Sequence, residues 1–353
     1  MTDFWAGRRV LITGISGFVG SNLTRVLVDA DADVVGLDLA RTSPSLRVLG
    51  LNDVPVLVRD VREMDRVQWA LEHGNGEAAW RPPEVVFHLA GISHPHQAQA
   101  TPLIAWDVNI RGTWCVLEAC RILPQIRAVV CASSDRVYGS LPKAHVPILA
   151  DGSRAYAAVK QDSIRAAWLE EDSPMETEVY GTSKACGDLL VRAYGAMGVP
   201  IVALRHQNAV GSADPHRSHI VTGTICDLLD GKAPVIRGDG TTIKGYIAVE
   251  SVCQAYLLLA EAVSTGRLAA GTAWNAAGVP ISVLSLVQAI IQISGRDAVP
   301  EILREDLSQS GCVEILDDSR LCALGWTPLS LQEALRHTWQ WYQERKGLAW
   351  LSP

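Results

Sequence analysis

The chain has 353 residues, 48% of them apolar, and a formal net charge of −7 at pH 7. This length is enough for a large hydrophobic core and for one to three domains. The negative charge and the lack of a long basic run argue against sequence-independent binding to nucleic acid, and no apolar run reaches the length of a membrane-spanning helix.

The chain has eight cysteines, and no two of them have the C-x-x-C spacing of a redox or zinc motif. Most lie in apolar runs, where a free thiol behaves as a small hydrophobic side chain. We therefore expect no disulfide framework and no metal site. The first residues lack the apolar segment of a signal peptide, and we expect a reducing, cytoplasmic compartment.

Short apolar runs alternate with helical patterns over residues 1–211. The strands are continuous apolar runs, which is typical of parallel strands that are covered on both faces. The predicted strands are 9–13, 33–38, 54–58, 84–88, 128–133 and 200–205, and the predicted helices are 18–31, 64–73, 103–122 and 180–197. This order predicts an α/β fold with a Rossmann-type doubly wound parallel sheet.

The alternation ends after residue 211. Helices are predicted at 220–229, 251–262, 283–294 and 331–343, and the strands between them are short and bounded by Gly and Pro. We expect a larger domain over 1–211, with an insertion at about 142–167, and a smaller C-terminal α+β lobe over 212–353. Ligands commonly bind in clefts between such parts, so we expect the lobe to contribute to a substrate site.

A glycine-rich turn follows the first predicted strand and opens the first helix. Its sequence is Thr13-Gly14-Ile15-Ser16-Gly17-Phe18-Val19-Gly20. In a dinucleotide site, Gly14 would permit the tight turn, Gly17 would let the backbone approach a pyrophosphate, and Gly20 would let helix and strand pack closely. The amino end of the helix would offer N–H groups and a partial positive charge to the phosphates.

Asp38 ends the next strand and raises the specificity of this pattern. A carboxylate at that point accepts hydrogen bonds from both hydroxyls of an adenosine ribose and repels a 2′-phosphate. The combination favours NAD as the cofactor. Arg41 lies close by and keeps NADP open as an alternative.

Tyr180 and Lys184 share one face of a predicted helix. We expect the ammonium to lower the pKa of the phenol from its ordinary value of ~10, so that the phenol can exchange a proton with a substrate hydroxyl. Tyr156 and Lys160 have the same spacing, but they lie in a charged segment of the insertion. Tyr180 instead opens an apolar helix, and we place it at the reacting carbon.

Polar residues follow the strand 128–133, at the end where parallel sheets bind ligands. They include Ser134, Asp135 and Arg136, in the run Ala132-Ser133-Ser134-Asp135-Arg136-Val137-Tyr138-Gly139. A plain polar cap between strand and loop would have similar residues. The run therefore indicates a ligand site only in combination with the other motifs.

Together these motifs resemble the extended short-chain dehydrogenase/reductase family, the NAD-dependent nucleotide-sugar epimerases and dehydratases. The resemblance runs from Arg8 to about Tyr342. Further matching segments are Asp60-Val61, His88-Leu89-Ala90-Gly91, Asn109-Ile110-Arg111-Gly112-Thr113, Arg205-His206-Gln207-Asn208-Ala209-Val210-Gly211 and Leu324-Gly325-Trp326-Thr327-Pro328. Members of the family exchange short segments between their two lobes.

The resemblance implies a role for each matching residue. It implies cofactor contacts from Gly14, Ser16, Gly17, Phe18, Val19, Gly20, Asp38, Asp60, Val61, Leu89, Ala90, Gly91, Tyr180 and Lys184. It implies contacts with a nucleotide-sugar substrate from Ser93, Ser134, Arg136, Asn208 and Lys244. In this scheme Ser134 holds the sugar C4 oxygen beside Tyr180, Asp60 contacts adenine, Asn208 contacts the substrate diphosphate, and Asn109 is structural or catalytic.

Asp135 helps to choose a reaction within the family. The matching residue is small in 4-epimerases and often acidic in 4,6-dehydratases, where it protonates the departing C6 hydroxyl. The Ser-Asp-Arg run is closest to CDP-glucose 4,6-dehydratase-like proteins, which implies Ser134, Asp135, Tyr180 and Lys184 as catalytic residues. A 4-epimerase, another sugar-nucleotide oxidoreductase and a non-catalytic NAD-binding regulator are alternatives.

The sequence also departs from the family pattern. Arg136 replaces the glutamate of other dehydratases, so that the group removing the C5 proton is not identified. Lys244-Gly245 replaces an Arg-Asp pair, and Ser251 replaces an aspartate. By analogy with the fold family we expect a homodimer that associates through the helices 103–122 and 180–197.

Overall fold

The computed structural model describes residues 4–76, 80–138, 178–305 and 307–346. These residues divide into two compact units, and each unit draws on separate stretches of the chain. The first unit comprises the described residues of Met1–Tyr138, Ser173–Arg205 and Val252–Trp274, and the second comprises those of His206–Ser251 and Asn275–Pro353.

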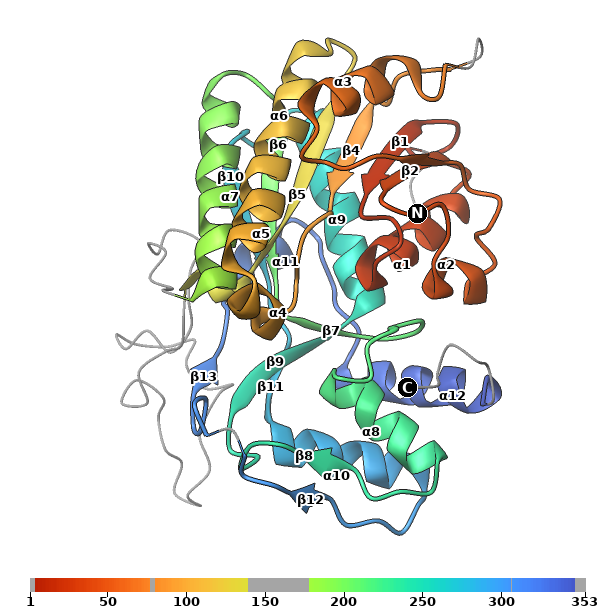
Figure 1. Cartoon of the computed structure of the whole chain (residues 1–353), viewed down its shortest axis with the longest axis vertical. Coiled ribbons are helices and arrows are strands. Elements are labelled where there is room, and N and C mark those ends of the chain that lie inside the picture. Colours follow the sequence, from red (N-terminus) through yellow and green to blue (C-terminus); the bar gives the residue numbers. More distant parts are fainter. Residues whose placement is uncertain (1–3, 77–79, 139–177, 306, 347–353) are drawn as a thin grey trace. The chain divides into compact units, whose positions relative to one another are not determined.

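The first unit is built on a seven-stranded sheet in the order β10-β6-β5-β4-β1-β2-β3 (Figure 1). Its strands are β1 (Arg9–Thr13), β2 (Asp33–Asp38), β3 (Val56–Val58), β4 (Val85–His88), β5 (Ala128–Ser134), β6 (Ile201–His206) and β10 (Thr272–Ala276). The pairs of β1 with β2 and β4, of β2 with β3, and of β4 with β5 are parallel. Val10, Leu11 and Ile12 are all fully buried, as expected of a strand covered on both faces. The Rossmann-type prediction is confirmed.

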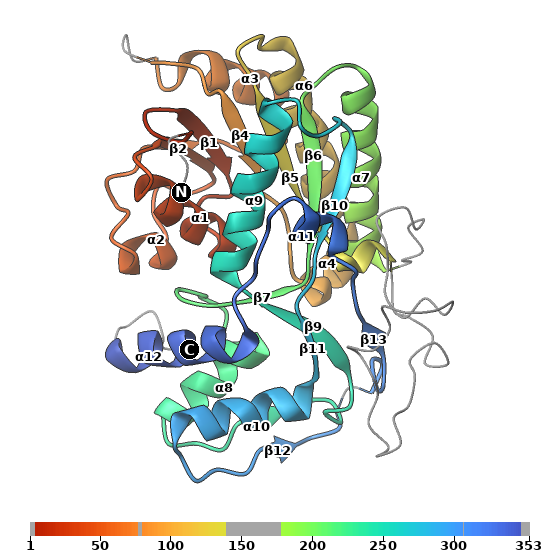
Figure 2. The same cartoon turned by 180° about the vertical axis from the view of Figure 1, so that it is seen from behind.

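Helices cover both faces of this sheet. They are α1 (Phe18–Val28), α2 (Pro44–Val48), α3 (Met64–His73), α4 (Pro95–Ala100), α5 (Pro102–Trp106), α6 (Gly112–Ile122), α7 (Val179–Ala196) and α9 (Val249–Ser264). One face packs against α3, α6 and α7 through a continuous core that includes Val67, Leu117 and Val191. On the other face Phe87 of β4 meets Tyr256 of α9, with ring centres 6.0 Å apart. Figure 2 shows α9 and α1 in front of the sheet on that side.

The predicted long helix 103–122 is interrupted. Between α5 and α6 lies a π-helix, η1 (Asp107–Arg111). π-Helical segments inside α-helices are rare and frequently lie at functional sites. Gly112 follows η1, and a Cβ at this position would lie 2.7 Å from Cγ2 of Val61. Only glycine lets the helix approach the loop after β3 this closely.

The second unit has a four-stranded sheet centred on β9 (Ile243–Ala248). The strands β7 (Asn208–Val210) and β13 (Val313–Glu314) pair with β9 in parallel, and β11 (Val279–Ser282) pairs with it antiparallel. The other elements are β8 (Val235–Ile236), β12 (Glu301–Ile302), α8 (Ile220–Leu229), α10 (Val283–Ser294), α11 (Ser319–Ala323) and α12 (Leu331–Glu344). The helices α8, α10 and α12 share one apolar core with β7 and β9.

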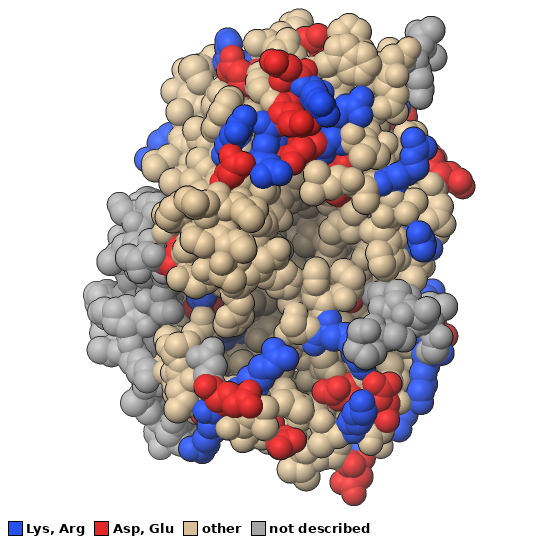
Figure 3. All heavy atoms as spheres, viewed as in Figure 1, with Lys and Arg blue, Asp and Glu red and all other residues tan. Residues whose placement is uncertain are grey.

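The predicted insertion at 142–167, with Tyr156 and Lys160, lies outside the described residues. Within the part of the chain that the structure describes, no helix combines the length and apolar character needed to cross a bilayer. Figure 3 shows acidic and basic side chains interspersed over the face that carries α3 and α6. Charge on this face is therefore mixed in sign.

Candidate active site

The geometry of the glycine-rich turn between β1 and α1 requires glycine at two positions. Gly14 has a φ of +73°, and a Cβ there would lie 2.7 Å from the backbone N of Ala90. A Cβ on Gly20 would lie 2.2 Å from the carbonyl oxygen of Gly14. The turn therefore packs directly against the loop after β4, which begins with Leu89.

Donor groups of this turn fit a dinucleotide. Gly17 is the N-cap of α1, and no side chain among the described residues caps this helix, which leaves N–H groups of the first turn for a phosphate. Oγ of Ser16 is buried and has no hydrogen-bond partner within the described residues. The carboxylate of Asp38 accepts from the backbone N–H of Ser16 at 2.9 Å, so the expected ribose acceptor lies against the turn.

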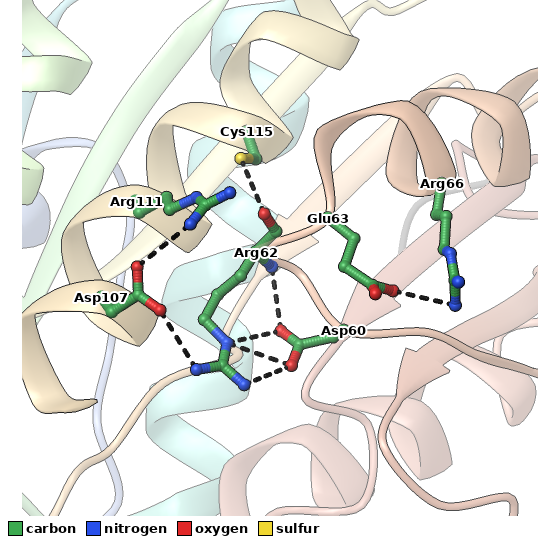
Figure 4. A network of polar contacts seen from close by, with 7 residues as sticks. All are labelled: Asp60, Arg62, Glu63, Arg66, Asp107, Arg111 and Cys115. Atoms are coloured by element: carbon green, nitrogen blue, oxygen red, sulfur yellow. Dashed lines mark hydrogen bonds and ion pairs between the residues drawn. The ribbon is translucent and has the colours of Figure 1, made fainter.

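A charged network includes Asp60 in the loop after β3 (Figure 4). Nε of Arg62 donates to both carboxylate oxygens of Asp60 at 3.0 Å, and Nη2 donates to one of them at 2.6 Å. These hydrogen bonds hold the pKa of Asp60 below its usual range. Nη1 of Arg62 also donates to Asp107 at 3.1 Å, and Arg111 lies 3.6 Å from the other oxygen of Asp107. Arg62, which the sequence motifs did not single out, thus joins the expected adenine contact to η1.

Asn109 in η1 ties three segments together. Its Oδ1 accepts from the backbone N–H of Ile92 at 2.7 Å, and its Nδ2 donates to the carbonyl of the same residue at 3.0 Å. Nδ2 also donates to Oγ of Ser183 at 2.8 Å. Asn109 therefore fixes the loop after β4 against the turn of α7 that lies between Tyr180 and Lys184.

His88 forms a second link beneath the glycine-rich turn. Its Nδ1 lies 2.8 Å from Oγ1 of Thr13, and its Nε2 lies 3.1 Å from Oγ1 of Thr113. Burial lowers the pKa of His88 to about 3, and the charge of Lys184 acts in the same direction. The imidazole is therefore neutral at pH 7, and it connects β1, β4 and α6 as a structural group.

The expected catalytic residues come together at the carboxyl end of β5. Tyr180 is buried on α7, and its phenol interacts with the side chain of Ser134. Nζ of Lys184 donates to the carbonyl of Ala132 at 2.9 Å and lies 6.0 Å from the centre of the Tyr180 ring. A Cβ on Gly91 would lie only 3.7 Å from this Nζ. The pair on α7 therefore adjoins the same loop that packs against the glycine-rich turn.

The expected direction of the Tyr180 pKa shift is wrong. Burial raises the pKa of Tyr180 to about 12; hydrogen bonding with Ser134 opposes this, and the charge of Asp135 adds to it. Burial also lowers the pKa of Lys184. Helical spacing places the ammonium near the phenol, but it does not reveal how much water both groups lose.

Two acidic residues, Asp135 and Glu178, interact electrostatically with the phenol of Tyr180. Oγ of Ser134 donates to Oδ1 of Asp135 at 3.0 Å, and Asp135 is 8% exposed. Oε1 of Glu178 caps α7 by accepting from the backbone N–H of Gly181 at 2.8 Å, and its Oε2 lies 3.8 Å from Nη2 of Arg136. Sequence reasoning missed Glu178, although an acidic residue directly before a helix is a recognisable N-cap signal.

The remaining expected substrate residues lie elsewhere in their units. Ser93 is exposed in the loop between β4 and α4. In the second unit, Asn208 on β7 donates to a backbone carbonyl of β9 at 3.0 Å. Nζ of Lys244 on β9 donates to Gln309 at 2.9 Å and lies 3.7 Å from Glu314, which partly balances its charge. Their contacts with substrate stay predictions.

Comparison with known proteins identifies a family model that matches most of the chain and several similar proteins. The model of the NAD dependent epimerase/dehydratase family matches residues 10–277. A CDP-glucose 4,6-dehydratase from Salmonella typhimurium is 26% identical over 288 residues, which cover 77% of this chain and 72% of the relative. A trifunctional UDP-glucose 4,6-dehydratase/UDP-4-keto-6-deoxy-D-glucose 3,5-epimerase/UDP-4-keto-L-rhamnose-reductase of Arabidopsis thaliana is 24% identical over 96% of this chain, but the match spans only 47% of that protein.

A solved structure supports the fold assignment. The UDP-N-acetylglucosamine 4-epimerase from Methanobrevibacter ruminantium M1, in complex with UDP-N-acetylmuramic acid, matches with a TM-score of 0.79 at 23% identity and covers 96% of this chain and 99% of its own. The family match includes the glycine-rich turn, Asp38, and the pair of Tyr180 and Lys184. The chain therefore belongs to the NAD dependent epimerase/dehydratase family, and its cofactor is NAD.

Proposed function

We propose that the protein is an NAD-dependent nucleotide-sugar 4,6-dehydratase, which converts a hexose nucleotide into a 4-keto-6-deoxy product. The observation that carries this proposal is Asp135. It is acidic and buried, and it directly follows Ser134, to which it is hydrogen-bonded. The similarity to a CDP-glucose 4,6-dehydratase supports the same reaction class.

The first step in this proposal is oxidation at C4. The glycine-rich turn, Asp38 and Asp60 would hold NAD, which when bound supplies a hydride acceptor and donor and a positively charged ring. Ser134 holds the C4 oxygen, and Tyr180 takes the C4 hydroxyl proton. Because burial raises the pKa of Tyr180 to about 12, the positive charge that the NAD ring supplies would favour the deprotonated phenol as the base.

The second step is loss of water. The new 4-keto group acidifies the C5 proton, which we assign to Glu178, since the guanidinium of Arg136 is not a base. Asp135 takes up a proton from solvent before this step and donates it to the C6 hydroxyl, which leaves as water as the C6–O bond breaks and a C5–C6 double bond forms. The carboxyl groups of Asp135 and Glu178 both interact electrostatically with the phenol of Tyr180. Glu178 is therefore available to remove the C5 proton, and Asp135 to protonate the C6 hydroxyl. The hydride taken from C4 then adds to C6, and C5 regains a proton.

Product mass tests this proposal against its alternatives. NAD-loaded protein is incubated with CDP-, GDP-, UDP- and dTDP-hexoses, and the nucleotide products are weighed by mass spectrometry. A 4,6-dehydratase yields a product that is lighter by one water. A product of unchanged mass would identify a 4-epimerase, and no product from any hexose nucleotide would identify a non-catalytic NAD-binding regulator.

We also infer that two copies associate through α5, α6 and α7. These neighbouring helices carry exposed apolar side chains, among them Leu103 at 76% and Leu189 at 56% exposure. Light scattering should give the mass of a dimer for the wild type and of a monomer for Leu189→Arg. A wild-type monomer would contradict this inference. The cytoplasmic location expected from the sequence stays a prediction.

A further inference from the structure

A buried ion pair joins α7 to the end of β6. Nε of Arg205 lies 2.5 Å from Oδ2 of Asp188, and the two side chains are only 2% and 7% exposed. Nη1 of Arg205 also donates to the hydroxyl of Tyr138, and the guanidinium lies 4.7 Å from the centre of that ring. Arg205 therefore bonds at the same time to α7 and to the short 3₁₀-helix η2 (Asp135–Tyr138).

Both of these elements carry the proposed catalytic groups. Tyr180, Lys184 and Asp188 follow one another at four-residue steps of α7 and so lie on one face of this helix. The helix η2 begins directly after Ser134, ends at Tyr138 and packs against α7. Arg205 thus fixes the Ser134 end of β5 relative to the helix that carries the phenol and the ammonium.

The charge of Asp188 acts on two cations, Arg205 and Lys184. Its Oδ2 is paired with Arg205, whereas its Oδ1 is buried and has no hydrogen-bond partner in the described part of the chain. The carboxylate also acts on the ammonium of Lys184 and opposes the effect of burial on it. The two cations therefore share one buried negative charge.

The other titratable groups near this ammonium are neutral. They are Tyr180 on α7, which burial keeps in its neutral phenol form at pH 7, and Cys131 of β5 and His88 of β4, which interact with Lys184 from the sheet. Burial raises the pKa of the Cys131 thiol and lowers the pKa of His88 to about 3, so neither is charged at pH 7. Within this group of side chains, Asp188 therefore supplies the negative charge.

We propose that Asp188 and Arg205 are positioning residues of the catalytic site, which align Ser134 with Tyr180 and keep Lys184 in its charged state. This inference rests on the proposed function where it concerns turnover. Breaking one partner of a buried ion pair leaves an uncompensated charge, so each single substitution should disturb the remaining cation or anion strongly.

The two partners make opposite predictions for Lys184. Asp188→Asn leaves Lys184 beside the charge of Arg205 alone, which should lower the pKa of Lys184. Arg205→Met leaves Asp188 to be balanced by Lys184, which should raise that pKa. The double variant should restore a value between the two. A purely structural role would not produce shifts of opposite sign.

NMR of the NAD-loaded protein measures these shifts without requiring turnover. Lysine side chains are labelled with ¹³C at Cε, and the resonance of Lys184 is identified by its loss in Lys184→Arg. The control is Asp33→Asn, which breaks the ion pair of 2.5 Å between Arg9 and Asp33 at the amino ends of β1 and β2. We expect the control to lower the melting temperature and to leave the titration of Lys184 unchanged.

Kinetics test the alignment with the nucleotide sugar that the wild type converts. Arg205→Lys keeps the charge but loses the fork that reaches both partners, and we expect kcat to fall about tenfold or more with KM within about threefold. Tyr138→Phe removes only the hydroxyl, so it should fold, lower kcat and leave the titration of Lys184 in place. Asp188→Glu should recover part of the kcat that Asp188→Asn loses.

The outcomes separate this inference from the proposed function. A wild type that converts no hexose nucleotide refutes the proposed function, while the titration of Lys184 still decides the role of the pair. Opposite shifts in Asp188→Asn and Arg205→Met support the inference. An unchanged titration of Lys184 in both variants, or shifts of the same sign, would overturn it.

Discussion

Nδ2 of Asn109 donates to Oγ of Ser183 at 2.8 Å, and this hydrogen bond joins the π-helix to the catalytic turn of α7. Asn109→Leu keeps the side-chain volume but leaves Ser183 and the backbone of Ile92 without their partner. We expect a loss of about 1–3 kcal/mol in the free energy of unfolding, together with a lower kcat.

Urea unfolding and steady-state kinetics check this prediction. Asn52 is exposed, and Asn52→Leu serves as a control that should change neither quantity appreciably. If Asn109→Leu had the free energy of unfolding and the kcat of the wild type, the hydrogen bond between η1 and α7 would contribute to neither stability nor catalysis.

His88 makes stability depend on pH in the acid range. Its pKa in the folded protein is about 3, below the ordinary histidine value of 6.5, because burial disfavours the charged ring. The unfolded chain therefore binds a proton that the folded protein does not, and stability is lost as the pH falls from about 6.5 towards 3. We expect His88→Gln to lose stability less steeply over this range.

The measurement is the free energy of unfolding in urea at several pH values between 7.5 and 5. His96 is exposed, and His96→Gln should retain the acid dependence of the wild type. The account of His88 would be wrong if the two variants had the same slope of stability against pH.

Arg62 should matter for cofactor affinity, because it orients Asp60 through both carboxylate oxygens. We expect Arg62→Met to raise the Kd for NAD about tenfold, which corresponds to about 1.4 kcal/mol. The matched control is Arg66→Met, since Arg66 forms an exposed ion pair of 3.2 Å with Glu63. Calorimetric titration of NAD compares the two variants, and equal affinities would contradict a role of Arg62 in the adenine region.

Glu178 is the group that we assign to the C5 proton. Glu178→Gln keeps the size and part of the capping of α7 but removes the base. Oxidation at C4 should then proceed without elimination, so that the absorbance of reduced nicotinamide rises on mixing with substrate and persists. Glu63→Gln is the control, and it should show no persistent absorbance. Normal turnover of Glu178→Gln would remove this residue from the mechanism.

Local patterns predicted the sheet and the long helices because strand periodicity and helix caps are properties of neighbouring residues. The strand Asp33–Asp38 and the helix Met64–His73 have the predicted bounds. The short helices Pro44–Val48 and Pro95–Ala100 were missed, since five or six residues hold too little periodicity. Residues 252–274 join the first unit through contacts distant in sequence, which no local pattern reveals.

The sequence predicted which helix carries Tyr180 and Lys184, but it did not predict the electrostatics of this pair. The spacing of Tyr180 and Lys184 placed both on one helical face, but the raised pKa of Tyr180 depends on burial by segments far away in the chain. Asp188 and Arg205 lie 17 residues apart, on a helix and on the following strand. Their pairing follows from how α7 packs on the sheet, and no motif marks it.

The central claim is that Tyr180 and Asp135 serve one reaction that moves a hydride from C4 to C6 of a nucleotide-linked hexose. The most direct test uses the accepted hexose nucleotide with deuterium at C4 and locates the label in the product by NMR. The account predicts deuterium in the new methyl group at C6. Deuterium retained at C4 would contradict it, because a hydride that returns to C4 belongs to an epimerase.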